Sequence, residues 1–168
     1  TYYRLHFNLD PASDSFSGRT SIALKVQAAT PAITLHADDL EATEVQLTTQ
    51  SSARKARTLQ VDKNPSNQTW RLTPQDGQPI AAGKYALNIE YTGRLNKHDA
   101  GLYKAPYTNQ RQASTMLATQ LEAVFARKLF PSFDEPAFRS TFEISIKAPA
   151  AYEVHANMPV RSIQVQEI

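Results

Sequence analysis

The chain has 168 residues, a formal net charge of +2 and no cysteine. The lack of cysteine excludes disulfides, thiolate zinc sites, iron–sulfur clusters and a cysteine nucleophile, and leaves cytosolic and oxidising compartments equally open. The nearly balanced charge argues against nucleic-acid binding, since neutralising many phosphates requires a marked excess of Lys and Arg. No apolar stretch approaches the roughly 20 residues of a membrane-spanning helix, so no membrane span is expected.

A chain of this length can bury a sizeable core without a disulfide or a structural metal. We therefore expect a single domain over residues 1–168. The sequence starts without Met and ends inside an alternating segment, so we also expect it to be part of a longer protein.

Apolar and polar residues alternate along most of the chain, which indicates strands with one buried face. Near the start, an alternating segment at 4–9 is followed by turn-forming residues at 10–14 and by Gly18, which predicts a hairpin with a second strand around 21–27. The further predicted strands are 31–36, 43–49, 57–61, 68–73, 84–92, 114–122, 139–148, 152–156 and 160–166. The residues expected to form the core are Phe7, Leu24, Leu35, Leu87, Ile89, Phe142 and Ile144.

The segment 123–130 does not show this alternation of apolar and polar residues. It contains good helix formers with apolar residues near helical spacing, and it stops at Pro131, so one short helix is predicted there. Many short strands and the lack of repeated helical crossovers favour an all-β fold over an α/β fold. The expected architecture is an antiparallel β-sandwich or an open, curved barrel.

The four histidines, at positions 6, 36, 98 and 155, form no His-Glu-x-x-His motif and no other pair with metal-ligand spacing. Exposed structural roles are favoured for all four. We expect no metal, no cofactor and no catalytic residue in this chain, which also lacks a Gly-x-Ser-x-Gly elbow and a phosphate-binding glycine loop.

Asp134 and Glu135 are adjacent carboxylates between Pro131 and Pro136. Paired carboxylates can hydrolyse glycosides, but they must face one sugar from separations of roughly 5 to 9.5 Å, whereas adjacent side chains diverge. We favour a structural role, in which the rigid turn directs these carboxylates at Arg127 or at backbone amides.

Gln120 and Glu122 lie at the end of the predicted strand 114–122 and would share one of its faces. A carbonyl oxygen and a carboxylate side by side can accept the hydrogen bonds of a substrate ammonium group. The spacing alone favours the alternative, in which both are polar side chains facing solvent at a sheet edge.

The most specific motif consists of the runs ATQLEA (118–123) and ARKLFPSFDEPAF (126–138). Further segments with the same character are Gly101-Leu102-Tyr103, TFEISI (141–146) and Asn157-Met158-Pro159. Together these segments resemble the amino-terminal domain of the zinc aminopeptidases of the aminopeptidase N family, and the resemblance covers nearly the whole chain.

This resemblance implies a saddle-shaped, mainly β domain, built as an antiparallel β-sandwich or open sheet, that caps a thermolysin-like catalytic domain acting on the amino terminus of peptides. It implies that Gln120 lines the pocket for the first side chain and that Glu122 holds the free α-amino group. The zinc, its ligands and the general base would belong to the catalytic domain, outside these residues. Ser132 stands where many relatives carry Cys, Leu121 replaces a common aromatic residue or Met, and Ala123 replaces a frequent Pro.

Two hypotheses follow. The first is the substrate-anchoring, non-catalytic domain of a zinc aminopeptidase that removes amino-terminal residues from peptides. The second is a binding or scaffold domain, either of a catalytically inactive relative or of an unrelated glycan- or protein-binding β module. The sequence that follows in the parent gene separates them, because only the first hypothesis requires a His-Glu-x-x-His helix there.

Overall fold

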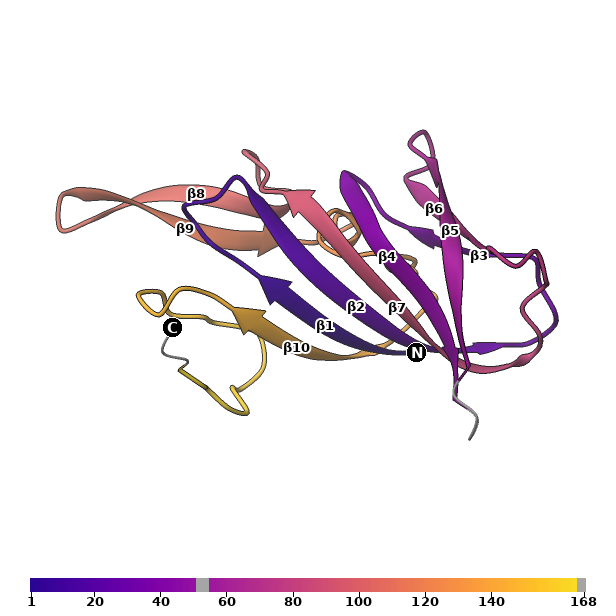
Figure 1. The fold of residues 1–168 in the computed structure, drawn as a ribbon. Coiled ribbons are helices and arrows are strands. Elements are labelled where there is room, and N and C mark those ends of the chain that lie inside the picture. The colour runs from indigo at the N-terminus through magenta and orange to yellow at the C-terminus, as the bar shows by residue number, and fades with distance from the viewer. Residues whose placement is uncertain (51–54, 166–168) are drawn as a thin grey trace.

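The computed structural model describes residues 1–50 and 55–165, and it confirms an almost entirely β fold (Figure 1). The strands are β1 (Tyr2–Asn8), β2 (Ser15–Val26), β3 (Ile33–His36), β4 (Leu40–Thr49), β5 (Ala56–Asn64), β6 (Thr69–Pro74), β7 (Gly83–Arg94), β8 (Gly101–Asn109), β9 (Gln112–Gln120) and β10 (Thr141–Lys147). Within the described ranges, no helix has the length and apolar character needed to cross a membrane.

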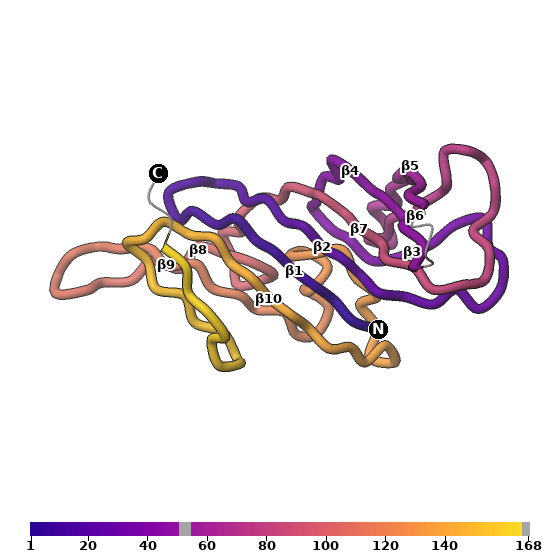
Figure 2. Tube along the Cα trace, turned by 60° about the horizontal axis from the view of Figure 1, so that its bottom comes forward, coloured from indigo at the N-terminus to yellow at the C-terminus, as the bar shows by residue number. Residues whose placement is uncertain are grey.

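Eight strands form one curled, open sheet in the order β10-β1-β2-β7-β4-β5-β6-β3, and β8 pairs with β9 in a separate hairpin. Figures 1 and 2 show the sheet curving along its width, with the β8–β9 hairpin extending beyond it. The strand pairs are antiparallel except for β1 and β10, which run parallel with Tyr2 opposite Thr141 and Asn8 opposite Lys147. The predicted antiparallel character therefore holds for most of the sheet, and β10 makes the sheet mixed.

The predicted hairpin between the first two strands is confirmed. The Asp10 side chain accepts a hydrogen bond from the Ala12 N–H at 2.9 Å, and its carbonyl oxygen accepts one from the Ser13 N–H at 3.0 Å. This is the local bonding by which Asp favours turns. Gly18 on the returning strand is required by packing, because a Cβ at this position would overlap the ring of Tyr91.

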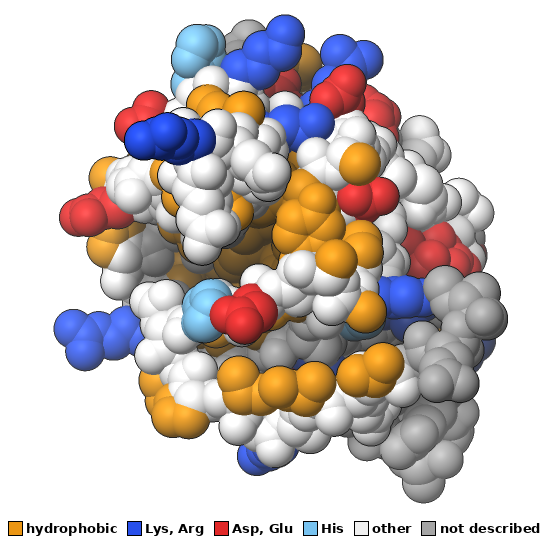
Figure 3. Space-filling model, turned by 90° about the vertical axis from the view of Figure 1, so that its left-hand side faces the viewer, with side chains coloured by type: hydrophobic (Ala, Val, Ile, Leu, Met, Phe, Trp, Pro, Cys, Tyr) orange, Lys and Arg blue, Asp and Glu red, His pale blue; other side chains and the backbone are white. Residues whose placement is uncertain are grey.

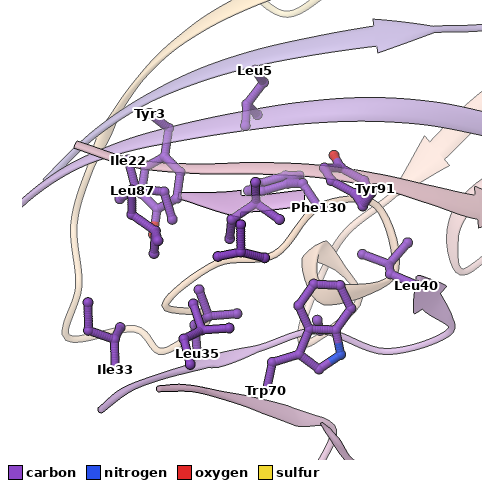
Figure 4. Close-up of a cluster of buried hydrophobic side chains, with 14 of the residues drawn as sticks. Tyr3, Leu5, Ile22, Ile33, Leu35, Leu40, Trp70, Leu87, Tyr91 and Phe130 are labelled. Carbon is purple, nitrogen blue, oxygen red and sulfur yellow. The ribbon is translucent and has the colours of Figure 1, made fainter. Parts of the chain in front are cut away.

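The core fills the concave side of the curled sheet. Figure 4 shows Tyr3, Leu5, Ile22 and Leu87 facing Ile33, Leu35 and Trp70, with Phe130 between the two groups. Phe7, Leu35, Leu87 and Ile89 are buried as predicted, and Leu24 is half-buried against this core.

Two of the predicted core residues are not buried. Phe142 and Ile144 are each 52% exposed, because β10 is an edge strand whose inner face is left uncovered by the described residues. The predicted strands 152–156 and 160–166 do not form within the described residues, and residue 166 lies outside them. The sequence missed β8, in which Pro106 and a run of exposed residues obscure the alternation.

The helix predicted over 123–130 is reduced to one 3₁₀ turn, η1 (Ala126–Lys128). Leu129, Phe130 and Pro131 after it are buried, and Ser132 forms a β-bridge with His36. The helical conformation is disfavoured for the residue before a proline, so the helix does not continue through Phe130, and the buried segment leads on to the bridge at Ser132.

Candidate functional site

Gln120 is the last residue of β9, and Glu122 lies two residues further on, in the turn that leads to η1. Gln120 Nε2 donates a hydrogen bond of 3.3 Å to the backbone carbonyl oxygen of Glu122, and both side chains are exposed. The strand predicted over 114–122 thus ends early, so the two residues do not share a strand face. The cause is Leu121, which packs against the core while its carbonyl oxygen accepts the Phe125 N–H at 3.0 Å.

This turn presents two hydrogen-bond acceptors. With Nε2 directed at the backbone, Gln120 keeps its Oε1 atom as an acceptor, and the Glu122 carboxylate has no hydrogen bond or ion pair with the described residues. A carboxylate and an amide oxygen suit a ligand with several N–H donors, such as a primary ammonium group. Such contacts are weak in water and strengthen where a second surface excludes it.

Gly101 positions the end of β9 from the opposite strand. It pairs with Gln120 in the β8–β9 ladder and has a φ of +66°. A Cβ on Gly101 would lie 2.7 Å from Lys128 Cβ and 3.3 Å from Asn96 Nδ2. Glycine is therefore needed both for the backbone conformation and for the close contact between the hairpin and η1.

We expect Gly101→Ala to lower the free energy of unfolding by more than Gly77→Ala does. Both glycines have a positive φ, which costs roughly 1–3 kcal/mol in other residues, but a Cβ on Gly77 would meet no atom within 4 Å. The overlap with Lys128 should add about 1–3 kcal/mol, the usual cost of overpacking. Urea unfolding of the two variants measures this difference, and equal losses would contradict the packing role of Gly101.

Lys128 joins η1 to the loop between β3 and β4. Its Nζ atom lies 2.6 Å from Asp38 Oδ2 and 2.8 Å from Asp39 Oδ2. Burial alone would lower the pKa of Lys128, but hydrogen bonds to these two carboxylates outweigh it and raise the pKa. The backbone N–H of Asp38 also donates to the Arg127 carbonyl oxygen at 2.9 Å. The turn after Glu122 is thus held by this loop as well as by the hairpin.

Arg127 links η1 to the segment before β10. Its Nε donates to Asp134 Oδ2 at 2.9 Å, its Nη2 to the Asp134 carbonyl oxygen at 3.2 Å, and its Nη1 to Gln68 Oε1 at 3.2 Å. The side chains of Arg127 and Asp134 are only 11% and 15% exposed. Glu135 is exposed, and its carboxylate makes no hydrogen bond or ion pair within the described part of the chain. Only one of the two adjacent carboxylates therefore pairs with Arg127.

His36 and Ser132 fasten the same segment to β3. The His36 N–H donates to the Ser132 carbonyl oxygen at 2.8 Å, and the Ser132 N–H donates back at 3.0 Å. His36 Nδ1 is buried without a hydrogen-bond partner among the described residues, so the expectation of an exposed histidine is wrong here. Burial lowers the pKa of His36, and Arg127 lowers it further, against the opposing charge of Asp134.

The lowered pKa of His36 predicts a pH-dependent stability. Below about pH 6.5 the unfolded chain binds a proton at this residue more readily than the folded chain does, so the free energy of unfolding falls as the pH falls. The stability of the wild type minus that of His36→Gln should therefore decrease between pH 7.5 and pH 5. Urea unfolding at several pH values tests this, with His98→Gln as the control, and a constant difference for His36→Gln would contradict it.

No group of three or more His, Asp or Glu side chains that could hold a metal ion occurs in the part of the chain that the structure describes. A small pocket of about 130 Å³ lies between β1, the segment after η1 and β10. Its lining residues include Tyr3, Phe130, Phe133, Asp134, Phe138 and Phe142. The Phe133 N–H donates to the Tyr3 hydroxyl at 3.0 Å, which fixes one wall of this pocket to β1.

Sequence reasoning expected Arg127 to pair with Asp134 or Glu135, but it missed Gly101 and Lys128, which also position the Gln120–Glu122 turn. For Gly101, an isolated glycine at the start of a strand was a usable signal. No local sequence pattern predicts the contact between Lys128 and Asp39, which lie 89 positions apart.

The comparisons with known proteins agree with the resemblance identified above. Residues 1–167 match the family model described as the Peptidase M1 N-terminal domain. Glutamyl aminopeptidase of Homo sapiens is 32% identical over 165 residues, which are 95% of this chain and 17% of that protein. Endoplasmic reticulum aminopeptidase 1 of Homo sapiens is 31% identical over 170 residues, covering 99% of this chain and 18% of that protein.

A plant relative gives the same picture. Aminopeptidase M1-B of Oryza sativa subsp. japonica is 30% identical over 158 residues, covering 94% of this chain and 17% of that protein. The chain therefore spans less than a fifth of the length of these curated relatives. With nearly all of its residues matched, the chain belongs to the peptidase M1 N-terminal domain family.

Proposed function

We propose that the chain is the non-catalytic, substrate-anchoring β domain of a zinc aminopeptidase that removes amino-terminal residues from peptides. The observation that carries this proposal is the match of residues 1–167 to the Peptidase M1 N-terminal domain, supported by relatives that are named aminopeptidases. The zinc ligands and the general base would come from a catalytic domain elsewhere in the polypeptide. The described residues do not fit a zinc site, so no catalytic step is assigned to them.

In this proposal Glu122 accepts hydrogen bonds from the α-ammonium group of the substrate, and Gln120 lines the pocket for the first side chain. The exposure of both side chains and their adjacency in one turn support these roles. A carboxylate adds an attractive charge to its hydrogen bonds, which makes it the stronger anchor of the two.

The rigidity of the turn supports the same roles. Gly101 allows η1 to pack closely against the β8–β9 hairpin, and Lys128 binds two aspartates. The Arg127–Asp134 ion pair holds the segment that follows η1. A site fixed by such surrounding contacts loses little entropy when the substrate binds. The neighbouring exposed residues, among them Val124, leave room for a second domain to cover the turn and exclude water.

The test is the activity of the longer parent polypeptide. We expect one bound zinc per chain, hydrolysis of aminoacyl anilides that stops on chelation of the zinc, and very low rates on amino-acetylated peptides. A scaffold or binding domain of an inactive relative would give a folded protein without zinc or hydrolysis. That result would overturn the proposed function.

A further inference from the structure

The exposed apolar side chains of the molecule gather in one part of the chain. Of the described residues, all twelve large apolar side chains that are clearly exposed lie at position 107 or later, and residues 1–50 and 55–106 contribute none. They belong to the β8–β9 hairpin, the turns on either side of η1, β10 and the chain that follows β10. Figure 3 views this side and shows apolar side chains around a hollow. Exposed apolar side chains that gather on one surface of a protein often mark a place where a partner binds.

β10 forms one border of this surface. It pairs with β1 on one edge, and its other edge has no partner strand among the described residues. Phe142 stands opposite Tyr3, and Ile144 stands opposite Leu5, so their side chains continue the inner face on which the buried core lies. The core thus extends past β1 onto β10 and ends there uncovered.

Phe142 on this border is only partly covered by neighbouring side chains. Its ring stacks on Tyr3 with a centroid distance of 5.2 Å and lies 6.2 Å from the ring of Phe130, yet half of the residue is exposed. The pocket of about 130 Å³ opens beside it. An edge with unpaired backbone groups and an apolar inner face has the properties that β-strand addition requires.

We propose that a β-strand from the part of the polypeptide outside this domain pairs with the free edge of β10 and covers Phe142 and Ile144 with apolar side chains. This inference rests on the proposed function, because it takes the remaining polypeptide as the occupant. The curated relatives carry more than four fifths of their length outside the matched region. A tethered segment reaches effective concentrations of about a millimolar, which favours it over a second copy of the chain.

Photo-crosslinking of the longer polypeptide tests the occupant of this edge. p-Benzoylphenylalanine is placed at position 144 in one variant and at position 143 in the control. Glu143 is the adjacent residue, but its side chain lies on the opposite face, where it contacts Tyr2 and Arg4. We expect irradiation to join position 144 to a residue of the same polypeptide outside 1–168, with no such product from position 143. A product that joins two copies, a product confined to residues 1–168, or no product from position 144 would overturn the proposal.

Hydrogen exchange on the unmodified polypeptide provides a second measurement in case the bulky residue disturbs the contact. A free edge leaves every second amide of a strand without a partner, whereas an added strand protects consecutive amides. We expect all amides from Phe142 to Ile146 to exchange at least tenfold more slowly than those of an unstructured chain. Rapid exchange at every second position would contradict strand addition.

The two measurements do not depend on catalysis. A crosslinked and protected but inactive polypeptide would retain this inference and overturn the proposed function. An active enzyme without the crosslink or the protection would retain the proposed function and overturn this inference.

Discussion

We expect Glu122→Gln in the longer polypeptide to lower kcat/KM for peptides with a free amino terminus by one to two orders of magnitude. The substitution keeps the shape of the side chain and removes the charge that the α-ammonium group would meet. A hydrogen bond to a charged group contributes about 1.5–3 kcal/mol, which corresponds to roughly a ten- to two-hundredfold change in rate. Steady-state kinetics on aminoacyl anilides measures the effect.

Gln120→Ala serves as the companion variant. Because Gln120 is neutral and is proposed to line the side-chain pocket, its loss should lower the overall rate less and should change the ranking of first residues more. An unchanged kcat/KM for Glu122→Gln, in a protein that is folded and zinc-loaded, would show that this carboxylate is only a solvated surface group.

We expect Arg127→Met to lower the free energy of unfolding by about 3–5 kcal/mol, the usual cost of removing one partner from a buried ion pair. The variant leaves the Asp134 carboxylate, only 15% exposed, without its counter-charge. Urea unfolding measures the loss. Arg19→Met is the matched control, because the ion pair between Arg19 and Glu90 is largely exposed and such pairs contribute about 0–1 kcal/mol.

A double variant separates the unpaired charge from the lost packing. Arg127→Met combined with Asp134→Leu should be more stable than Arg127→Met alone, since no charge is then left buried. If Arg127→Met costs no more than Arg19→Met, the ion pair does not hold the segment after η1.

The sequence predicted the all-β class and most strands because alternation reports directly on which face of a strand is buried. Leu35 and Leu87 illustrate this, since both lie at inward positions of alternating segments and both are buried. The same pattern failed at Phe142 and Ile144. Alternation indicates which face of a strand is apolar. It does not indicate whether the residues that cover this face belong to the same segment of the chain.

The candidate site was harder to predict than the fold. The spacing of Gln120 and Glu122 singled them out, but only the resemblance favoured a functional role for them. The strand geometry first assigned to them was wrong because Leu121 turns the chain toward the core. The contacts that hold the turn, such as Lys128 with Asp39, join residues far apart in sequence. Hydrophobic periodicity carries no information about such pairings, which depend on tertiary packing.

The proposed function depends on a contact between the Glu122 carboxylate and the α-ammonium group of the substrate. The most direct measurement compares a competitive inhibitor that carries a free α-amino group with its deamino counterpart, each tested against the wild type and Glu122→Gln. We predict that the wild type binds the amine more tightly than the deamino compound. The Kd of the deamino compound divided by the Kd of the amine should be at least tenfold smaller in Glu122→Gln than in the wild type. An equal ratio in the two proteins would show that Glu122 does not contact the amino group.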